Sequence, residues 1–185
     1  MVTFEDLLEE RRDTILQRWE EVVLSAYPAD SAALFRSQQD PFANPLGHSV
    51  REGTRGVFQT ILDGMDQEKL RTHLDQIIRI RAVQQLTPTE ALSFVFSLRS
   101  IVRDVIPEAG ADARHRAGLT SFDEKIDEVA MAAFEIYAAM REEVSQLRVN
   151  EVKRQVSWVL EKMNRRKEGL EDVLEDSSSR EGCCG

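Results

Sequence analysis

The chain has 185 residues, a formal net charge of −9 and 42% hydrophobic residues. This length can bury one core, so we expect a single domain with an appendage. The acidic balance argues against general nucleic-acid binding, and no apolar run approaches the ~18 residues that a membrane span needs. The first residues are acidic where a signal peptide would be basic. The two cysteines are adjacent in the sequence, so they cannot form a disulfide that links distant parts of the fold. We therefore expect a soluble, cytoplasmic protein.

Apolar residues recur at helical spacing between the prolines, and no stretch of useful length alternates like a strand. Thr87, Pro88 and Glu90 form a helix-start signature with a capping box. The sequence predicts an all-α fold with loops over residues 38–47 and 108–119. Six helices are expected, over residues 3–26, 28–36, 49–63, 67–85, 88–106 and 121–166.

The helix expected over residues 88–106 is apolar on nearly every side, which is typical of a helix surrounded by others. Gly53 and Gly56 lie one turn apart in the helix expected over residues 49–63, where each costs about 1 kcal/mol relative to alanine. A close helix crossing would offset that cost. These features favour a globin-like helical domain of about six helices, with an up-down helical bundle as the alternative.

Two stretches, "DPFANPLGHSVREGTRGVFQTILDG" and "IIRIRAVQQLTPTEALSFVFSLRSIVRDV", resemble the RsbRD-type N-terminal domain. This is the sensory module of bacterial RsbR-type stressosome proteins, the RsbT co-antagonists. The resemblance covers about Phe4 to Leu147 and implies a globin-like fold without haem, dimerisation and input to a regulatory output. In full-length relatives a STAS domain follows, and we expect none here. Its most specific pieces are Asn44, Pro45 and Gly47, then Arg51–Gly53, then Arg79–Gln84.

Arginines interrupt the apolar pattern. Arg81 continues the stripe of Leu70, Leu74 and Ile77, so its side chain should point toward the core or its edge. A buried guanidinium needs a partner. Glu52 and Asp104 are both candidates for a structural ion pair.

A second interpretation is that some of these arginines recognise a ligand. In it Arg51, Arg79 and Arg81 line a site for an anion or an acidic partner.

The sequence gives little support to haem binding or catalysis. His73 is the best placed of the three histidines for an axial ligand, but it can equally sit at the edge of the core. No phosphate-binding loop, nucleophile elbow or zinc-protease motif is present. We expect no cofactor, no metal site, no catalytic residue and no enzymatic activity.

The last helix changes its apolar face. One stripe follows spacings of four and three as far as Val144 and Leu147, whereas the next begins five residues on, at Val152. A step of five residues rotates the stripe by about 140°. The second stripe therefore predicts a dimer or partner contact, although packing on the same domain is an alternative. Its residues are Val152, Val156, Val159 and Met163.

The same region is locally basic, with 7 Lys and Arg against 3 Glu over residues 148–168. Cations near the C-terminus of a helix interact favourably with the helix dipole. A basic amphipathic helix can also make a weak peripheral membrane contact or bind an acidic protein. The vicinal Cys183 and Cys184 can be an inert end or a redox-active thiol tail. We thus expect a globin-like RsbRD-type domain over residues 1–147, a basic amphipathic extension over 148–168 and a flexible polar tail over 169–185.

The function predicted from these features is non-enzymatic. We expect a sensory and regulatory protein-interaction domain that works as a homodimer, with a regulatory protein partner and no nucleic acid. Two alternatives stay open: an accessory or assembly protein of a membrane-associated redox complex, and a sensor of a small ligand or anion.

Overall fold

The computed structural model describes residues 3–27, 32, 35, 40, 42–84, 86–106 and 113–181. In residues 164 and 166–181 only the backbone is described. The chain divides into two compact units, Met1–Arg141 and Glu142–Gly185. The boundary lies close to the Leu147 expected from the change of apolar stripe.

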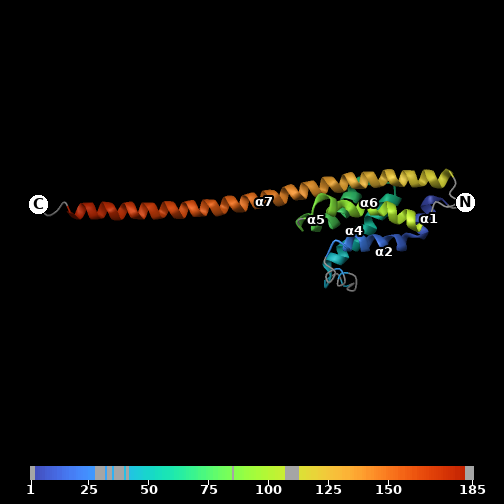
Figure 1. Ribbon diagram of the computed structural model, residues 1–185, viewed down its shortest axis with the longest axis horizontal. Coiled ribbons are helices and arrows are strands. Elements are labelled where there is room, and N and C mark those ends of the chain that lie inside the picture. The colour runs from blue at the N-terminus through green and yellow to red at the C-terminus, as the bar shows by residue number, and fades with distance from the viewer. Residues whose placement is uncertain are drawn as a thin grey trace. The chain divides into compact units, whose positions relative to one another are not determined.

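The described residues form helices and contain no strand. The all-α prediction with a long C-terminal helix is confirmed, and the arrangement is consistent with a globin-like helical domain (Figure 1). The helices are α1 Phe4–Glu10, α2 Arg12–Leu24, α4 Pro45–Leu62, α5 Gln67–Val83, α6 Pro88–Val105 and α7 Ala113–Glu181.

Two helices begin at the capping boxes that the sequence encodes. The Thr3 hydroxyl accepts from the Asp6 backbone N–H at 3.1 Å, and the Asp6 carboxylate accepts from the Thr3 N–H at 2.8 Å. Those hydrogen bonds lower the pKa of Asp6. At the start of α6 the Thr87 backbone N–H and hydroxyl both donate to the Glu90 carboxylate, at 2.9 and 2.8 Å. Local sequence therefore determines both starts.

Several predicted boundaries are wrong. The first helix is interrupted at Arg11, but only locally, because Arg11 still donates to the Leu7 carbonyl and accepts from the Ile15 N–H. Helix α7 starts at Ala113, so residues 113–119 are helix and not loop. It also continues through residues 169–181, which were expected as a polar tail. Most of the short helix expected over residues 28–36 lies outside the described residues.

Helices α4 and α5 cross closely, as the glycines predict. A Cβ added at Gly53 would lie 2.6 Å from Ile77 Cγ1 and 3.0 Å from the His73 carbonyl oxygen. A Cβ at Gly56 would lie 2.2 Å from His73 Nδ1. The two helices are joined by a turn in which Gly64 has a φ of 98°. Glycine adopts this left-handed conformation without steric cost.

Helix α6 supplies a large part of the core, and Phe94, Val95 and Leu98 are fully buried. However, α6 is not covered by other helices on every side. Ser93 and Ser100 are exposed, and so is Phe96, whose side chain is 49% exposed. The prediction that α6 is surrounded by other helices is therefore wrong for this one face.

Candidate functional site

Arg81 lies in α5 and is 1% exposed, so its predicted position in the core is confirmed. Its partners are backbone carbonyls and not Glu52 or Asp104. Nη1 donates to the Ala91 carbonyl at 2.9 Å, and Nη2 donates to the Val23 carbonyl at 2.9 Å. The guanidinium thus ties the last turn of α2 to the first turn of α6.

Carbonyl partners suit this position for an electrostatic reason. The carbonyls of a helix's last turn lack intrahelical donors and carry the negative end of the helix dipole. Val23 belongs to the last turn of α2, and so it offers a partial negative charge to a cation without a carboxylate. Burial lowers the pKa of Arg81. An arginine keeps its proton at physiological pH all the same.

Aromatic rings complete the surroundings of Arg81. Its guanidinium carbon lies 5.0 Å from the centre of the Phe94 ring, a cation–π geometry. The Trp19 ring stacks on Phe94 at 6.0 Å, and Trp19 Nε1 donates to the Phe94 carbonyl at 2.7 Å. Burial raises the pKa of the nearby Tyr27 hydroxyl, and the positive charge of Arg81 opposes that rise. Arg81 is therefore part of the folded core.

The other two arginines of the expected anion site lie in different surroundings. Arg79 is exposed, and its Nε is 3.2 Å from an Asp75 carboxylate oxygen one turn earlier. Arg51 lies in α4 and donates to the Phe35 carbonyl at 3.3 Å. The structure therefore does not bring the three arginines together into one site.

Arg51 borders a cavity of about 600 Å³ between α2 and α4. Arg55 lines it from the same helix, and Glu20 faces it from α2. Glu20 and Arg55 form an ion pair at 3.9 Å. Burial raises the pKa of Glu20, and the cations of Arg55 and Arg51 counteract part of that effect. The cavity thus has mixed charge and is not a purely anionic-ligand site.

The turn at Asn44, Pro45 and Gly47 is a helix start. The Asn44 amide oxygen accepts from the Gly47 N–H at 2.8 Å, and its amide nitrogen donates to the Phe35 carbonyl at 2.8 Å. Pro45 occupies the first turn, where no N–H is needed. A Cβ at Gly47 would lie 2.2 Å from the Asn44 amide nitrogen, so a larger residue would displace the capping side chain. These residues position α4.

His73 lies at the crossing of α4 and α5, half-buried against Gly56. The spacing predicted a residue at the core edge or an axial ligand. The contact with Gly56 gives this ring a packing role at the crossing. Among the described residues no group of three or more His, Cys, Asp or Glu side chains could hold a metal ion. Cys183 and Cys184 lie outside the described residues.

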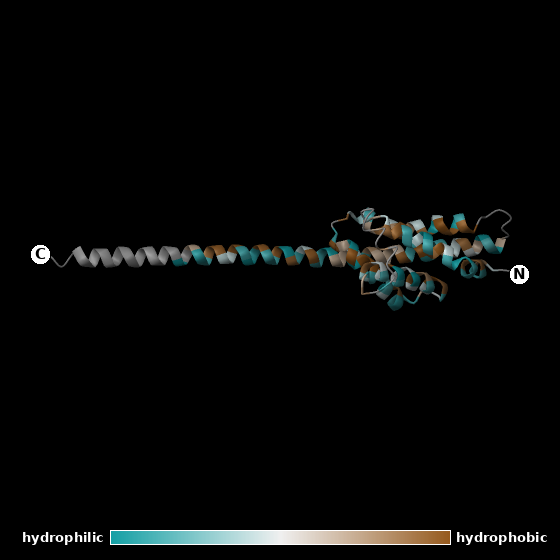
Figure 2. Ribbon diagram, turned by 90° about the horizontal axis from the view of Figure 1, so that it is seen from below, coloured by the Kyte–Doolittle hydropathy of each residue, from teal (hydrophilic) through white to brown (hydrophobic). Residues whose placement is uncertain are grey.

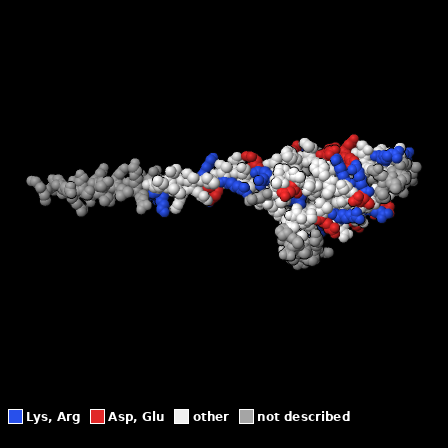
Figure 3. Space-filling model, viewed as in Figure 1, with Lys and Arg blue, Asp and Glu red and all other residues white. Residues whose placement is uncertain are grey.

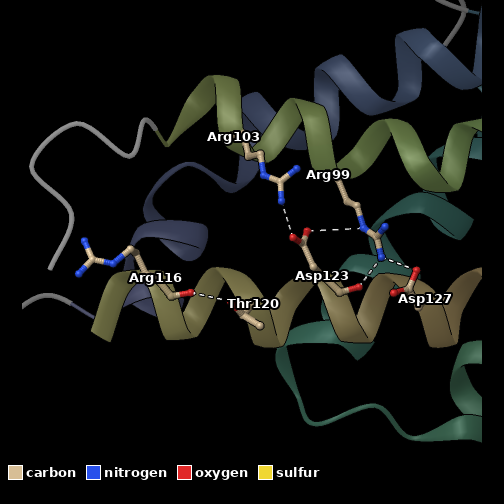
Figure 4. A network of polar contacts seen from close by, with 6 residues as sticks. All are labelled: Arg99, Arg103, Arg116, Thr120, Asp123 and Asp127. Atoms are coloured by element: carbon tan, nitrogen blue, oxygen red, sulfur yellow. Dashed lines mark hydrogen bonds and ion pairs between the residues drawn. The ribbon is translucent and has the colours of Figure 1, made fainter. Parts of the chain in front are cut away.

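A polar network between α6 and α7 had no clear signal in the sequence (Figure 4). Arg99 pairs with Asp127, lies 3.5 Å from an Asp123 carboxylate oxygen and donates to the Asp123 backbone carbonyl at 2.6 Å. Arg103 pairs with the other Asp123 oxygen. These contacts fix α7 against α6 within the unit Met1–Arg141. Only the antiparallel packing of the two helices brings these charges together.

The match to a known protein family covers most of the chain, including the Asn44 turn and Arg81. Residues 13–152 match the family described as RsbT co-antagonist protein rsbRD N-terminal domain. The chain belongs to this family. No curated protein and no solved structure matches the chain. The RsbRD family is one of regulatory, sensor-type domains, so membership confirms the resemblance and the regulatory class.

The RsbRD match ends in the second unit, where the apolar side chains of α7 are exposed. We call Val149, Val152, Val156, Val159 and Met163 the seam. Their side chains are 42% to 63% exposed. Val149 was not predicted to belong to this stripe, although it lies three residues before Val152. Hydrophobic residues recur between hydrophilic ones along this part of the helix (Figure 2).

Cations accompany the seam in this part of the RsbRD chain (Figure 3). Arg154 pairs with Glu151 at 2.6 Å, and that contact lowers the pKa of Glu151. Lys162 Nζ lies 5.0 Å from the centre of the Trp158 ring. In the described part of the chain no helix is long and apolar enough to cross a membrane.

Proposed function

We propose that this chain is a non-enzymatic regulatory module of the RsbRD type, acting in the cytoplasm, whose contact surface for other proteins is the seam of α7. The observation that carries the proposal is the exposure of the seam on a helix whose earlier turns are buried in the core of the helical unit. Val129 on α7 is 0% exposed, whereas Val156 on the same helix is 52% exposed. A helix that leaves one whole apolar stripe in water supports a role in protein contact.

The proposal assigns the unit Met1–Arg141 to sensing and to structure. Its arginine, aromatic and glycine contacts hold the helices in one arrangement, and Arg81 connects three of them. The seam residues belong to the second unit and are exposed. A change in one part can then act on the other through the continuous helix α7.

Homodimerisation is part of the proposal, as the family resemblance implies. Large apolar side chains are exposed on the helical unit itself, at Phe96, Met131 and Phe134. These positions support self-association through the helical unit. The seam then stays available to another protein.

The test compares the full chain with a truncation after Leu147. Circular dichroism should show that both fold, and sedimentation velocity should show a dimer for both. An unfolded truncation would make the C-terminal part of α7 a component of the core and would overturn the proposal. A monomeric full chain would remove the homodimer from it.

A second candidate function is the sensing of a small charged ligand in the α2–α4 cavity. The cavity places the Arg51 and Arg55 guanidinium groups beside the Glu20 carboxylate, which suits a molecule with both an acidic and a basic group. Free amino acids can be screened by thermal shift on the wild type and on Arg55→Ala. A shift that needs Arg55 would support this candidate, and no shift with any of them would argue against it.

A further inference from the structure

The seam follows a heptad pattern that the change of stripe introduces. Val149, Val152, Val156, Val159 and Met163 are spaced by three, four, three and four residues. This spacing places them at alternating a and d positions, with Val149, Val156 and Met163 at a. Such a stripe packs against another helix with the same periodicity.

The positions beside the stripe carry only one sign of charge. In a heptad the e and g residues flank the contact and decide which partner is accepted. From Arg148 to Met163 these flanking positions contain three cations and no anion. They are Arg148, Lys153, Gln155, Leu160 and Lys162.

The acidic residues of this segment lie on the opposite face and are already paired. Glu151 pairs with Arg154 at 2.6 Å, and Glu161 approaches Arg165 at 4.0 Å. Both acids therefore sit at outer positions of the heptad. Within the described residues, no ion pair is formed by Lys153 or Lys162, the cations that border the stripe on its two sides.

A second copy of this helix is a poor occupant for that arrangement. In a parallel pair, a g residue faces the e residue five positions on in the partner, which places Arg148 opposite the second copy's Lys153. In an antiparallel pair, e faces e and g faces g, so cations again meet cations. Like charges at such positions oppose association in either orientation.

We propose that the seam binds an amphipathic helix of a different protein, one that carries acidic residues beside its own apolar stripe. Glutamates or aspartates at the partner's flanking positions would pair with Arg148, Lys153 and Lys162. The apolar side chains of both helices would fill the contact between them. The inference rests on the proposed function, because it names the kind of partner that the regulatory module contacts.

Two designed helical peptides with identical apolar a and d residues provide the probe. One carries Glu at every e and g position and the other carries Lys. Binding of each labelled peptide to the full chain is measured by fluorescence anisotropy, at low and at high salt. Each flanking pair changes affinity roughly twofold in either direction, so three cations should favour the acidic peptide by on the order of tenfold or more. High salt should reduce that preference.

Matched variants separate charge from packing. Lys153→Glu combined with Lys162→Glu should remove or reverse the preference. Arg154→Glu combined with Arg165→Glu makes the same change of charge on the outer face and should leave the preference in place. Val156→Asp combined with Val159→Asp should abolish binding of the acidic peptide. All six positions are exposed, so the helical unit should fold in each variant.

Three results would overturn the inference. Equal binding of both peptides, or binding of neither, would show that flanking charge does not select the partner. A dimer that dissociates in Val156→Asp would make a second copy the occupant. Binding to vesicles containing phosphatidylserine, lost in the Lys153 and Lys162 variant and without binding of the acidic peptide, would assign the surface to a membrane. Equal binding of the two peptides would leave the proposed function standing, because the seam would still bind another helix. A second copy or a membrane on the seam would overturn the proposed function as well.

Discussion

Helix α7 has the same backbone conformation in both units but buries its apolar side chains in only one of them. In Met1–Arg141 its stripe of Ile126, Ala133 and Tyr137 is buried. In Glu142–Gly185 the seam is exposed. Leu147 of the first stripe and Val152 of the seam are five residues apart, a step that corresponds to a rotation of about 140° around the helix. A helix can therefore continue without interruption while the surface that it offers changes completely.

The same substitution in the two stripes should give the largest contrast. Val129→Asp places a carboxylate at a position with 0% exposure, where it finds no partner, and should cost about 4 kcal/mol or more of unfolding free energy. Guanidinium denaturation of the variant checks this. A cost below about 1 kcal/mol would mean that α7 does not pack in the core at Val129.

Arg81→Ala should have the next largest effect. The change removes the two guanidinium hydrogen bonds to the Val23 and Ala91 carbonyls and opens space beside Phe94, and it should cost about 2–4 kcal/mol. Arg79→Ala is the matched control, because that arginine is exposed and paired only within its own helix. It should change the unfolding free energy by less than about 0.5 kcal/mol. Equal costs for both variants would show that burial does not determine the role of Arg81.

These contacts show which parts of the structure the sequence can predict. The starts of α1 and α6 were predictable because a cap is a local pattern of three or four residues. The burial of Arg81 was predictable from its place on an apolar stripe. Its carbonyl partners were not, since every residue has a carbonyl and only the fold selects those of Val23 and Ala91. The same holds for the pairing of Arg99 with Asp127.

One boundary was missed although the sequence did contain its signal. Asn44 followed by Pro45 is a helix cap and a first-turn proline, yet this stretch was assigned to a loop. The exposed face of α6 had a weaker signal, because Phe96 is apolar and gives no sign of lying at the surface. Periodicity identifies what could be buried, and the number of neighbouring helices decides what is buried.

Gly56→Ala should have an intermediate effect whose sign depends on His73. The added Cβ would meet the His73 ring at 2.2 Å, so the variant should lose about 1–2 kcal/mol. In a His73→Ala background the same change should instead stabilise by up to about 1 kcal/mol, because alanine favours the helix more than glycine does. Thermal and chemical unfolding of the four proteins in this cycle measure the coupling. Equal effects in both backgrounds would place the tight contact elsewhere.

The smallest effect on folding should come from Val156→Asp, the counterpart of Val129→Asp on the exposed stripe. Its side chain is 52% exposed, so the carboxylate stays in water and the unfolding free energy should change by less than about 0.5 kcal/mol. The same denaturation experiment checks this. A large loss would mean that the seam packs against the helical unit. A negligible change in unfolding free energy, together with loss of acidic-peptide binding in the variant that combines Val156→Asp with Val159→Asp, would show that the two stripes have different roles. Substitutions in the first would then act on folding and substitutions in the second on partner binding.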